Sequence, residues 1–283
     1  MQKGAKMGGI RKRMLPAGWY PKSEAGVQKV FQDWEQSVGG TPSKAVSCIV
    51  PHAGWDFSGE LAFLTLRCLS SSVDTIAVVG GHLPARPAVL VTTADKFETP
   101  LGFLETDREL LKRVCNDIDY EEDLSPDNTV EIQLPLIKYL FPGTRILALR
   151  VSPTAEATLL GKKLYALSRE LGRRIAVVGS TDLTHYGAAY GFSPAGRGKG
   201  AIDWVRDEND KHFLDKALSM DGESAIDHAN SHRSACSAGA AAAAIAFAGE
   251  MGITTGRLIG YRMSCEVHMA ESFVGYGGII YAP

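Results

Sequence analysis

The chain has 283 residues, a formal net charge of −2 at pH 7 and 45% hydrophobic residues, which suits one large α/β domain or two smaller ones. The small net charge and the lack of a long basic tract disfavour nucleic acid and anionic membrane surfaces as main partners, and favour small-molecule chemistry. The five cysteines have no CxxC spacing, and no stretch has the pattern of a signal peptide or of a bilayer span, so we expect reduced thiols and a cytoplasmic protein.

Two patterns alternate along the chain. Apolar residues at spacings of three and four predict helices, and short runs rich in Val and Ile predict buried parallel strands. In chain order, the predicted elements are helix 24–37, strand 46–50, helix 58–69, strands 74–79 and 88–93, helix 107–115, a helical segment 129–140, strand 145–151, helix 155–171, a strand from 174, helices 201–218 and 237–252, and strands 257–263 and 272–281. We expect Asp107 to cap the helix that follows it, and Pro135 to kink or break its segment. Without a repeat or a clear linker, the pattern predicts one α/β domain.

The most loop-like stretch of the chain is 192–200, FSPAGRGKG. Glycine and proline supply turns there, and Arg197 and Lys199 add positive charge. We interpret this stretch as a mobile lid.

Three histidines each follow a predicted strand. His52 comes after AVSCIV-P, His82 after TIAVVGG and His185 after RIAVVGSTDLT. Ligand sites of open α/β sheets lie outside the carboxyl ends of the strands. Three imidazoles delivered to one rim of a sheet therefore predict a metal site or an acid–base site.

Cys236 is a fourth candidate, because it lies just before the Ala-rich helix 237–252. A helix N-terminus favours negative charge, so a thiolate there is available as a metal ligand or a nucleophile. The alternative is a small buried cysteine with no chemical role.

The motif TDLTHYG places Asp182 and His185 three residues apart on a turn after a strand. At that spacing a carboxylate can orient an imidazole, as in a general acid–base pair. The alternative is that Thr181 or Asp182 caps a helix and His185 lies at the surface. His212, His228 and His232 lie on or beside predicted helices, and we interpret them as solvated or core residues.

Taken together, these residues resemble the MEMO family, the B component of the bacterial and archaeal AmmeMemoRadiSam system. That family is similar in fold to class III (LigB-type) extradiol dioxygenases. The matching motifs occur in the expected order between residues 17 and 282: AGWYP, VPHAGWDFSG, GGH, TPLG, DNTVEIQLP, LFPGTRILALRV, STDLTHYG, the Cys236 segment and FVGYG. The resemblance implies a single three-layer α/β domain over 17–283, with a central, largely parallel mixed sheet flanked by helices, after a flexible segment 1–16.

The same resemblance implies a metal pocket with His52, His82 and Cys236 as ligands. Two imidazoles and a thiolate suit Fe(II), which we expect, and also zinc or copper. His185 would then be the acid–base histidine and Asp182 its neighbour. Working partners would be a radical SAM enzyme and an AMMECR-type protein.

Four further residues are expected to contact a small-molecule or peptide ligand: Trp55, Asn128, Glu131 and Tyr186. Core packing is the alternative for Trp55. Asn128 stands where many family members carry a histidine. An amide there can hydrogen-bond a substrate or water but cannot carry a proton at neutral pH.

Three functions fit these residues. The first is a dioxygenase-like, metal-dependent oxidoreductase in which His185, aided by Asp182, moves protons. The second is metal-free catalysis with Cys236 as nucleophile and His185 as base. The third is a non-catalytic module that binds a peptide or protein in the same cleft, since a shared fold does not establish shared chemistry.

Overall fold

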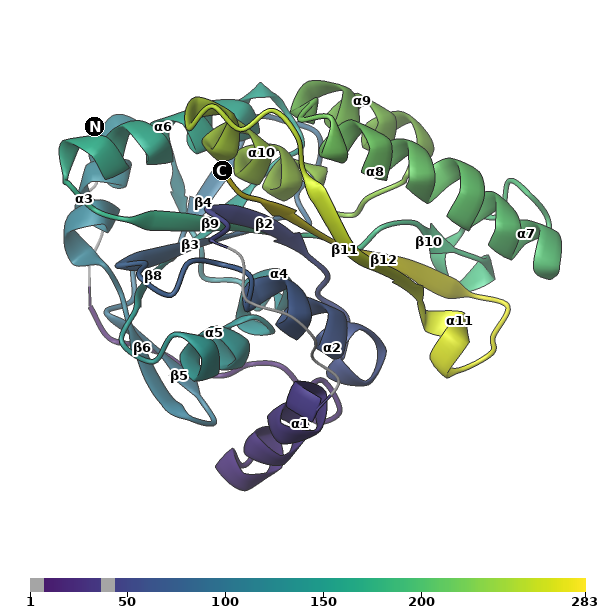
Figure 1. Ribbon diagram of the computed structural model, residues 1–283, viewed down its shortest axis with the longest axis horizontal. Helices are drawn as coiled ribbons and strands as arrows, with labels where there is room; N and C mark the ends of the chain where they lie inside the picture. Colours follow the sequence, from purple (N-terminus) through teal and green to yellow (C-terminus); the bar gives the residue numbers. More distant parts are fainter. Residues whose placement is uncertain (1–7, 37–43) are drawn as a thin grey trace.

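The computed structural model describes residues 8–36 and 44–283. Within these ranges, nine strands form a central sheet in the order β10-β12-β2-β9-β3-β8-β4-β7, with β11 paired to β12 (Figure 1). Its four inner strands run parallel: β2 (Ser47–Val50), β9 (Ile175–Ser180), β3 (Thr75–Gly80) and β8 (Arg145–Val151). The strands on either side of this group run antiparallel to it: β12 (Phe273–Tyr281) beside β2, and β4 (Val89–Val91) beside β8. The sheet is therefore mixed, with a parallel centre.

The remaining strands are short or lie at the margins. Three of them complete the central sheet: β7 (Glu121–Glu122), β10 (His185–Tyr186) and β11 (Arg257–Met263). A separate small sheet contains β1 (Ile10–Arg11), β5 (Lys96–Thr99) and β6 (Gly102–Glu105). The sequence pattern did not predict β5 and β6, because each is only four residues long and the pair folds back through the TPLG turn.

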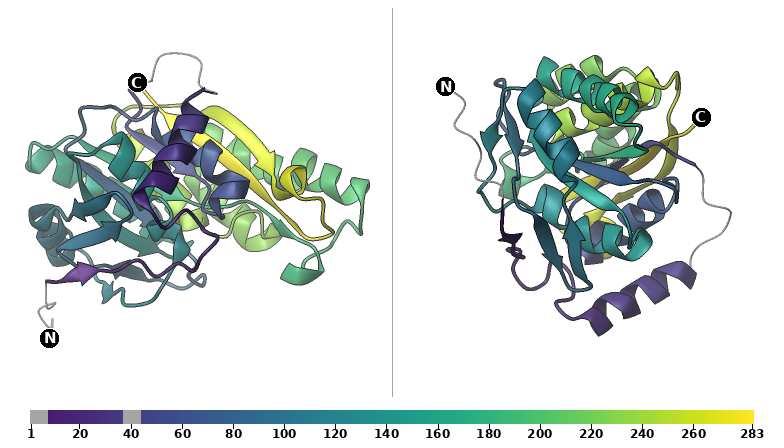
Figure 2. Two further views of the ribbon diagram at one scale, coloured as in Figure 1. Left: turned by 90° about the horizontal axis from the view of Figure 1, so that it is seen from below. Right: turned by 90° about the vertical axis from the view of Figure 1, so that its left-hand side faces the viewer.

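Helices cover both faces of the sheet, as Figures 1 and 2 show. One face carries α3 (Arg108–Asp117), α6 (Ala155–Glu170), α8 (Asp210–Leu218), α9 (Gly222–His232) and α10 (Ala238–Glu250). The other carries α1 (Glu24–Gln36), α2 (Trp55–Leu66), α4 (Asn128–Glu131) and α5 (Leu134–Leu140). Two short helices, α7 (Lys199–Trp204) and α11 (Ser264–Val267), lie beyond the inner strands. The expected three-layer α/β architecture is confirmed.

The two faces of β3 explain why its sequence is apolar after Thr75. Ala77 and Val79 belong to the hydrophobic core beneath α10, whereas Ile76 and Val78 belong to the core on the side of α2. Successive side chains of a strand point to opposite faces, so a strand covered on both sides has few polar positions.

Several local predictions can be compared directly with the structure. The Asp107 carboxylate accepts the Leu110 amide and caps α3, and the segment around Pro135 is split into α4 and α5. Helix α2 begins at Trp55, three residues before the predicted start. The predicted helix 201–218 contains a π-helical turn, Val205–Asn209, between α7 and α8. Helix α9 was missed, since its sequence is mostly polar.

We expected residues 1–16 to be flexible, and residues 1–7 of this segment lie outside the described residues. Residues 37–43 also lie outside them. Further along, β1 pairs with β5, and the backbone amides of Met14 and Leu15 donate to the Glu131 carboxylate. Residues 10–15 are thus attached to the domain in this structure.

The loop 192–200 is also attached. The Tyr186 hydroxyl donates to the Gly196 carbonyl and accepts from the Ala195 amide. None of the helices in the described part of the chain is long and apolar enough to cross a membrane.

Candidate metal centre

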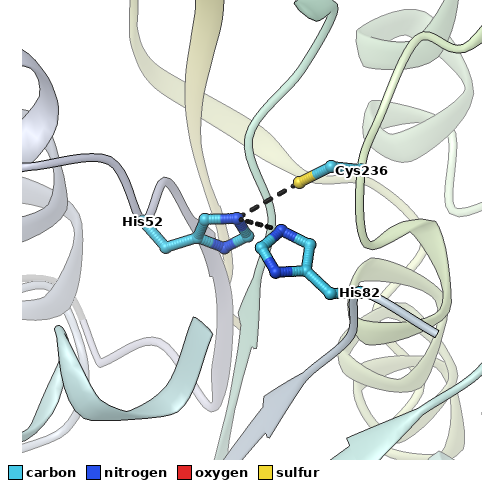
Figure 3. Close-up of side chains that lie close together, drawn as sticks. All are labelled: His52, His82 and Cys236. Carbon is cyan, nitrogen blue, oxygen red and sulfur yellow. Dashed lines mark hydrogen bonds between the residues drawn. The ribbon is translucent and has the colours of Figure 1, made fainter. Parts of the chain in front are cut away.

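Three side chains from distant parts of the chain meet at the carboxyl end of the parallel strands. His52 follows β2, His82 follows β3, and Cys236 lies two residues before α10 (Figure 3). The His52 Nε2 atom is 3.2 Å from His82 Nε2 and 3.2 Å from Cys236 Sγ. All three candidate ligand atoms lie within 4.8 Å of one another. The sequence-predicted ligand set is thus brought together.

The turn after β3 is shaped to deliver His82. The His82 backbone has a φ of +56°, a left-handed conformation that few residues other than glycine adopt, although histidine tolerates it better than most. A Cβ on Gly81 would lie 2.5 Å from the Ser237 side chain, so only glycine fits. The His82 amide in turn donates to Ser237 Oγ, at the start of α10. This turn therefore ties β3 to the segment that carries Cys236.

A carboxylate orients the His82 ring. Its Nδ1 atom lies 3.2 Å from Asp127 Oδ2, and Asp127 lies 3.2 Å from the buried Arg150 guanidinium. Because a carboxylate only accepts hydrogen bonds, Nδ1 carries a proton, and the Nε2 atom faces His52 and Cys236. A carboxylate behind an imidazole in this way is typical of metal-binding histidines. Burial opposes protonation of His82, but the Asp127 hydrogen bond and the Cys236 thiol raise the pKa of His82 to about 10.

His52 is held by buried polar groups on its other side. Its Nδ1 atom lies 3.2 Å from Ser180 Oγ, which also accepts from the Gln133 amide group. The His52 backbone amide donates to Asp182 Oδ1 over 2.6 Å. Burial favours the neutral imidazole, but the charges of Asp182 and Cys236 outweigh it and raise the pKa of His52. The ring is thus fixed with Nε2 toward the other two ligands.

The Cys236 thiol lies in an environment that favours its ionised form. Burial opposes ionisation, but the two imidazoles offset this and place the pKa of Cys236 well below its usual range. The Cys236 amide donates to the Asp182 carbonyl, so the backbone at Cys236 is tied to the segment that follows β9. A thiolate beside two Nε2 atoms is a donor set that soft and borderline transition metals prefer.

The spacing of these atoms agrees with one bound ion. A tetrahedral ion with bonds of about 2.0 Å to nitrogen and 2.3 Å to sulfur holds its ligand atoms about 3.3–3.6 Å apart. The two distances of 3.2 Å around His52 Nε2 are close to these values. The residues present therefore fit a metal ion with two imidazole ligands, one thiolate ligand and a fourth position open to other ligands.

A cleft of about 410 Å³ opens on the metal centre and contains both ligand histidines. Asn128, Asp182 and His185, which the sequence marked as candidates, also line it. Asn128 Nδ2 donates to the His52 carbonyl, so its amide oxygen remains able to accept. The cleft therefore combines a metal centre with polar groups that can bind or move protons.

The structure does not pair Asp182 with His185 as we expected. Asp182 accepts from the His52 amide, and His185 Nδ1 lies 3.1 Å from the Leu183 carbonyl oxygen. The His185 ring packs edge-on against Tyr190, with ring centroids 4.9 Å apart. Three-residue spacing brought both residues to the cleft but did not fix which partner each one takes.

Three expected ligand-binding residues lie elsewhere. Trp55 is buried, and its ring packs on those of Tyr20 and Phe31. The Glu131 carboxylate accepts from the N-terminal backbone and from the Tyr20 hydroxyl. Tyr186 is buried, stacked on Phe273 and bonded to the loop 192–200. None of these three is among the residues that line the cleft in the described chain, because each already fills a structural role.

Three further residues reach the site without a role assigned to them from the sequence. Tyr190 and His268 line the cleft from segments far apart in the chain, and Asp127 supports His82 from behind. The match of DNTVEIQLP to the family contained Asp127 but gave no role for it. The segment MSCEVH allows Cys265, Glu266 and His268 as a second set of ligands, although a structural role was our first interpretation, and His268 directly follows α11, which packs against β12.

Comparison with known proteins identifies the family of this chain. The family described as Memo-like protein matches residues 11–280. The chain belongs to this family. It is 28% identical to a MEMO1 family protein of Pyrococcus furiosus, over 96% of this chain and 98% of the relative. It is also 28% identical to a MEMO1 family protein of Thermococcus onnurineus and 24% identical to one of Methanosarcina barkeri, each covering 96% of this chain and 99% of the relative. The Memo-like match thus includes the whole metal centre.

Proposed function

We propose that this Memo-like protein is a metal-dependent oxidoreductase whose metal ion is held by His52, His82 and Cys236. The observation that carries the proposal is the convergence of their three ligand atoms, within 4.8 Å, where His52 and His82 line an accessible cleft. Three protein ligands with an open position are typical of catalytic rather than structural metal sites. The occupant of the cleft is a small molecule, and a peptide segment is the alternative.

Fe(II) is the proposed metal, with copper and zinc as the other ions that this donor set accepts. When bound, the ion supplies Lewis acidity and, for iron or copper, electron transfer. Asp127 and Ser180 orient the two imidazole rings. The neighbouring histidines lower the pKa of Cys236, which favours its thiolate form. If zinc is the only metal that the protein binds, the redox part of the proposal is excluded.

His185 is the proposed proton-transfer residue. Its Nδ1 donates to the Leu183 carbonyl, which can only accept, so Nε2 is left to take a proton from a substrate hydroxyl. Asp182 acts as a positioning residue, because its carboxylate holds the His52 backbone. The Asn128 amide oxygen is available to accept a hydrogen bond from substrate or water.

Oxygen uptake by the Fe(II)-loaded protein with a panel of catechols tests this function. We expect turnover that falls about 100-fold in His185→Ala, with metal content unchanged. His268→Ala, a second histidine of the cleft, is the matched control and should keep most of the turnover. Absence of uptake with every redox-active metal and substrate, despite a filled site, would instead favour the binding-module alternative.

One observation favours a second candidate, a cysteine-dependent enzyme without metal. The Cys236 thiol is 3.2 Å from His52 Nε2 and has a lowered pKa, as an activated nucleophile needs. In this structure the imidazole beside the thiol belongs to His52, and not to His185 as the sequence led us to expect. Activity that survives chelation and is lost on alkylation of Cys236 would favour this candidate.

A further inference from the structure

A second group of histidines lies on the surface of α8 and α9, outside the metal centre. His212 is on α8, and His228 and His232 are four residues apart on α9. The ring centroids of His212 and His228 are 5.7 Å apart, and those of His228 and His232 are 4.5 Å apart. From the sequence we interpreted these three histidines as solvated or core residues. In the structure they form one cluster, with His228 in the middle.

Hydrogen bonds prepare at least one of these rings for metal binding. His212 Nδ1 lies 2.7 Å from the Glu208 carbonyl oxygen, which can only accept, so Nδ1 carries the proton and Nε2 keeps its lone pair. His228 Nδ1 lies 2.7 Å from the buried Ser234 Oγ, which fixes that ring and leaves Nε2 on its other edge. An imidazole whose second nitrogen is hydrogen-bonded in this way is typical of metal ligands.

The protonation state of His228, the central ring, also suits a cation. Burial, followed by the charges of His232 and His212, lowers the pKa of His228 to about 4. The central imidazole is therefore neutral at pH 7, and no proton has to be displaced when a metal ion binds to it.

The ring centroids of the cluster are spaced much like those of His52 and His82, although its three ligand nitrogens do not all lie within 4.8 Å of one another in this structure. The centroids of His52 and His82 are 4.8 Å apart, between the two values in the cluster. Histidines four residues apart on one helix face are a common pair of metal ligands. The rings now lie at 15° and 36° to one another, so the exposed rings of His212 and His232 must turn for all three Nε2 atoms to meet. Exposed side chains make such rotations readily.

We propose that His212, His228 and His232 form a second metal site, which binds Zn(II) or a similar late transition-metal ion. Three imidazole nitrogen ligands do not suit Mg²⁺ or Ca²⁺, which take oxygen ligands. The donor set of this site differs from that of the first site, because it contains no thiolate. It lies beside the segment 233–236 that leads to Cys236, because Ser234 bonds His228 and Arg233 follows α9 directly.

Calorimetric titration of Zn(II) into the His52→Ala/Cys236→Ala variant tests this proposal, because that variant lacks two ligands of the first site. We expect it to bind one Zn(II) per chain. Adding His228→Ala or His212→Ala should lower the affinity by more than about 10-fold, since even second-shell changes at metal sites cost that much. Circular dichroism before titration shows that each variant is folded.

Ser231→Ala in the same background is the matched control, because it removes an exposed polar side chain of α9 that belongs to neither site. It should leave the Zn(II) affinity unchanged. The proposal is overturned if the double variant binds no Zn(II), if His228→Ala leaves the affinity unchanged, or if Ser231→Ala reduces binding as much as His228→Ala does.

Discussion

The two imidazoles of the metal centre are each held by a polar side chain from another part of the fold. Asp127 supports His82, and Ser180 supports His52. Neither was identified as a site residue from the sequence, because a supporting hydrogen bond depends on which strands are neighbours and leaves no spacing signal. The candidate ligands were named from the family resemblance, because the strand-end pattern marked His52 and His82 but left the role of Cys236 open. At the scale of single residues, the sequence thus indicates the candidate ligands but not the groups that orient them.

The role of Asp127 leads to a prediction about metal affinity. Asp127→Ala should weaken metal binding about 10- to 100-fold, as expected when the carboxylate behind a ligand histidine is lost. Asp127→Asn should keep most of the affinity, because an amide oxygen still accepts from His82 Nδ1. Competition with a chelator of known affinity measures both. Unchanged binding by Asp127→Ala would show that this carboxylate does not orient the ring.

Asp210 leads to a prediction about pH. It is buried, and its carboxylate accepts from the Thr184 backbone amide and from the Tyr261 hydroxyl, but desolvation dominates and raises the pKa of Asp210 to about 7. In the unfolded chain the pKa is about 4. Between pH 4 and 7 the folded state therefore holds a proton that the unfolded state has lost, so this group reduces stability as pH rises through that window.

The effect amounts to up to about 4 kcal/mol, and it is complete above pH 7. Asp210→Asn removes the titration. The difference in unfolding free energy between the variant and the native protein, measured by urea titration, should shift in favour of the variant from pH 5 to pH 7.5. A difference that stays constant over this range would contradict the raised pKa.

Helices and strands are the scale at which the sequence was most informative. All four parallel strands and the helices with a clear apolar stripe were predicted, since burial on one or both faces leaves a period in the sequence. Helix α9 and the strands β5 and β6 were missed: α9 exposes a mostly polar surface, and the two strands are too short to show a period. The glycine turn before His82 was visible in the sequence, whereas the close approach of Ser237 to Gly81 was not.

Close packing of α10 against its neighbours gives a prediction at this scale. A Cβ on Gly161 of α6 would lie well inside van der Waals contact with the Ala243 carbonyl oxygen, whereas a Cβ on Gly249 meets no atom within 4 Å. Gly161→Ala should therefore destabilise the protein by about 1–3 kcal/mol. Gly249→Ala should stabilise it by about 0.5–1 kcal/mol, because alanine is the better helix former. Thermal unfolding of both variants tests this, and equal effects would contradict the packing.

For the whole molecule, the order of motifs along the chain carried the most information. No single motif was decisive, but nine in the family's order resembled the MEMO family, and the Memo-like match over 11–280 confirms it. The partners and the reaction could not be obtained this way, since family membership fixes the fold and the position of the cleft rather than the ligand in it.

The attachment of the N-terminal segment to the domain leads to a prediction at this scale. Glu131 accepts from the Met14 and Leu15 amides and from the Tyr20 hydroxyl, so Glu131→Ala should release the chain before α1. Trypsin should then cut after Arg13 at least several-fold faster, because cleavage requires local opening. Glu24→Ala, which removes an exposed carboxylate on α1, is the control. Equal cleavage rates would show that Glu131 does not hold this segment.

Elemental analysis of anaerobically purified protein tests whether His52, His82 and Cys236 bind a metal ion. Anaerobic handling protects the thiolate from oxidation. After exhaustive buffer exchange, we expect the His52→Ala/Cys236→Ala variant to contain one transition-metal ion per chain fewer than the native protein. Equal metal content in the two proteins would contradict it.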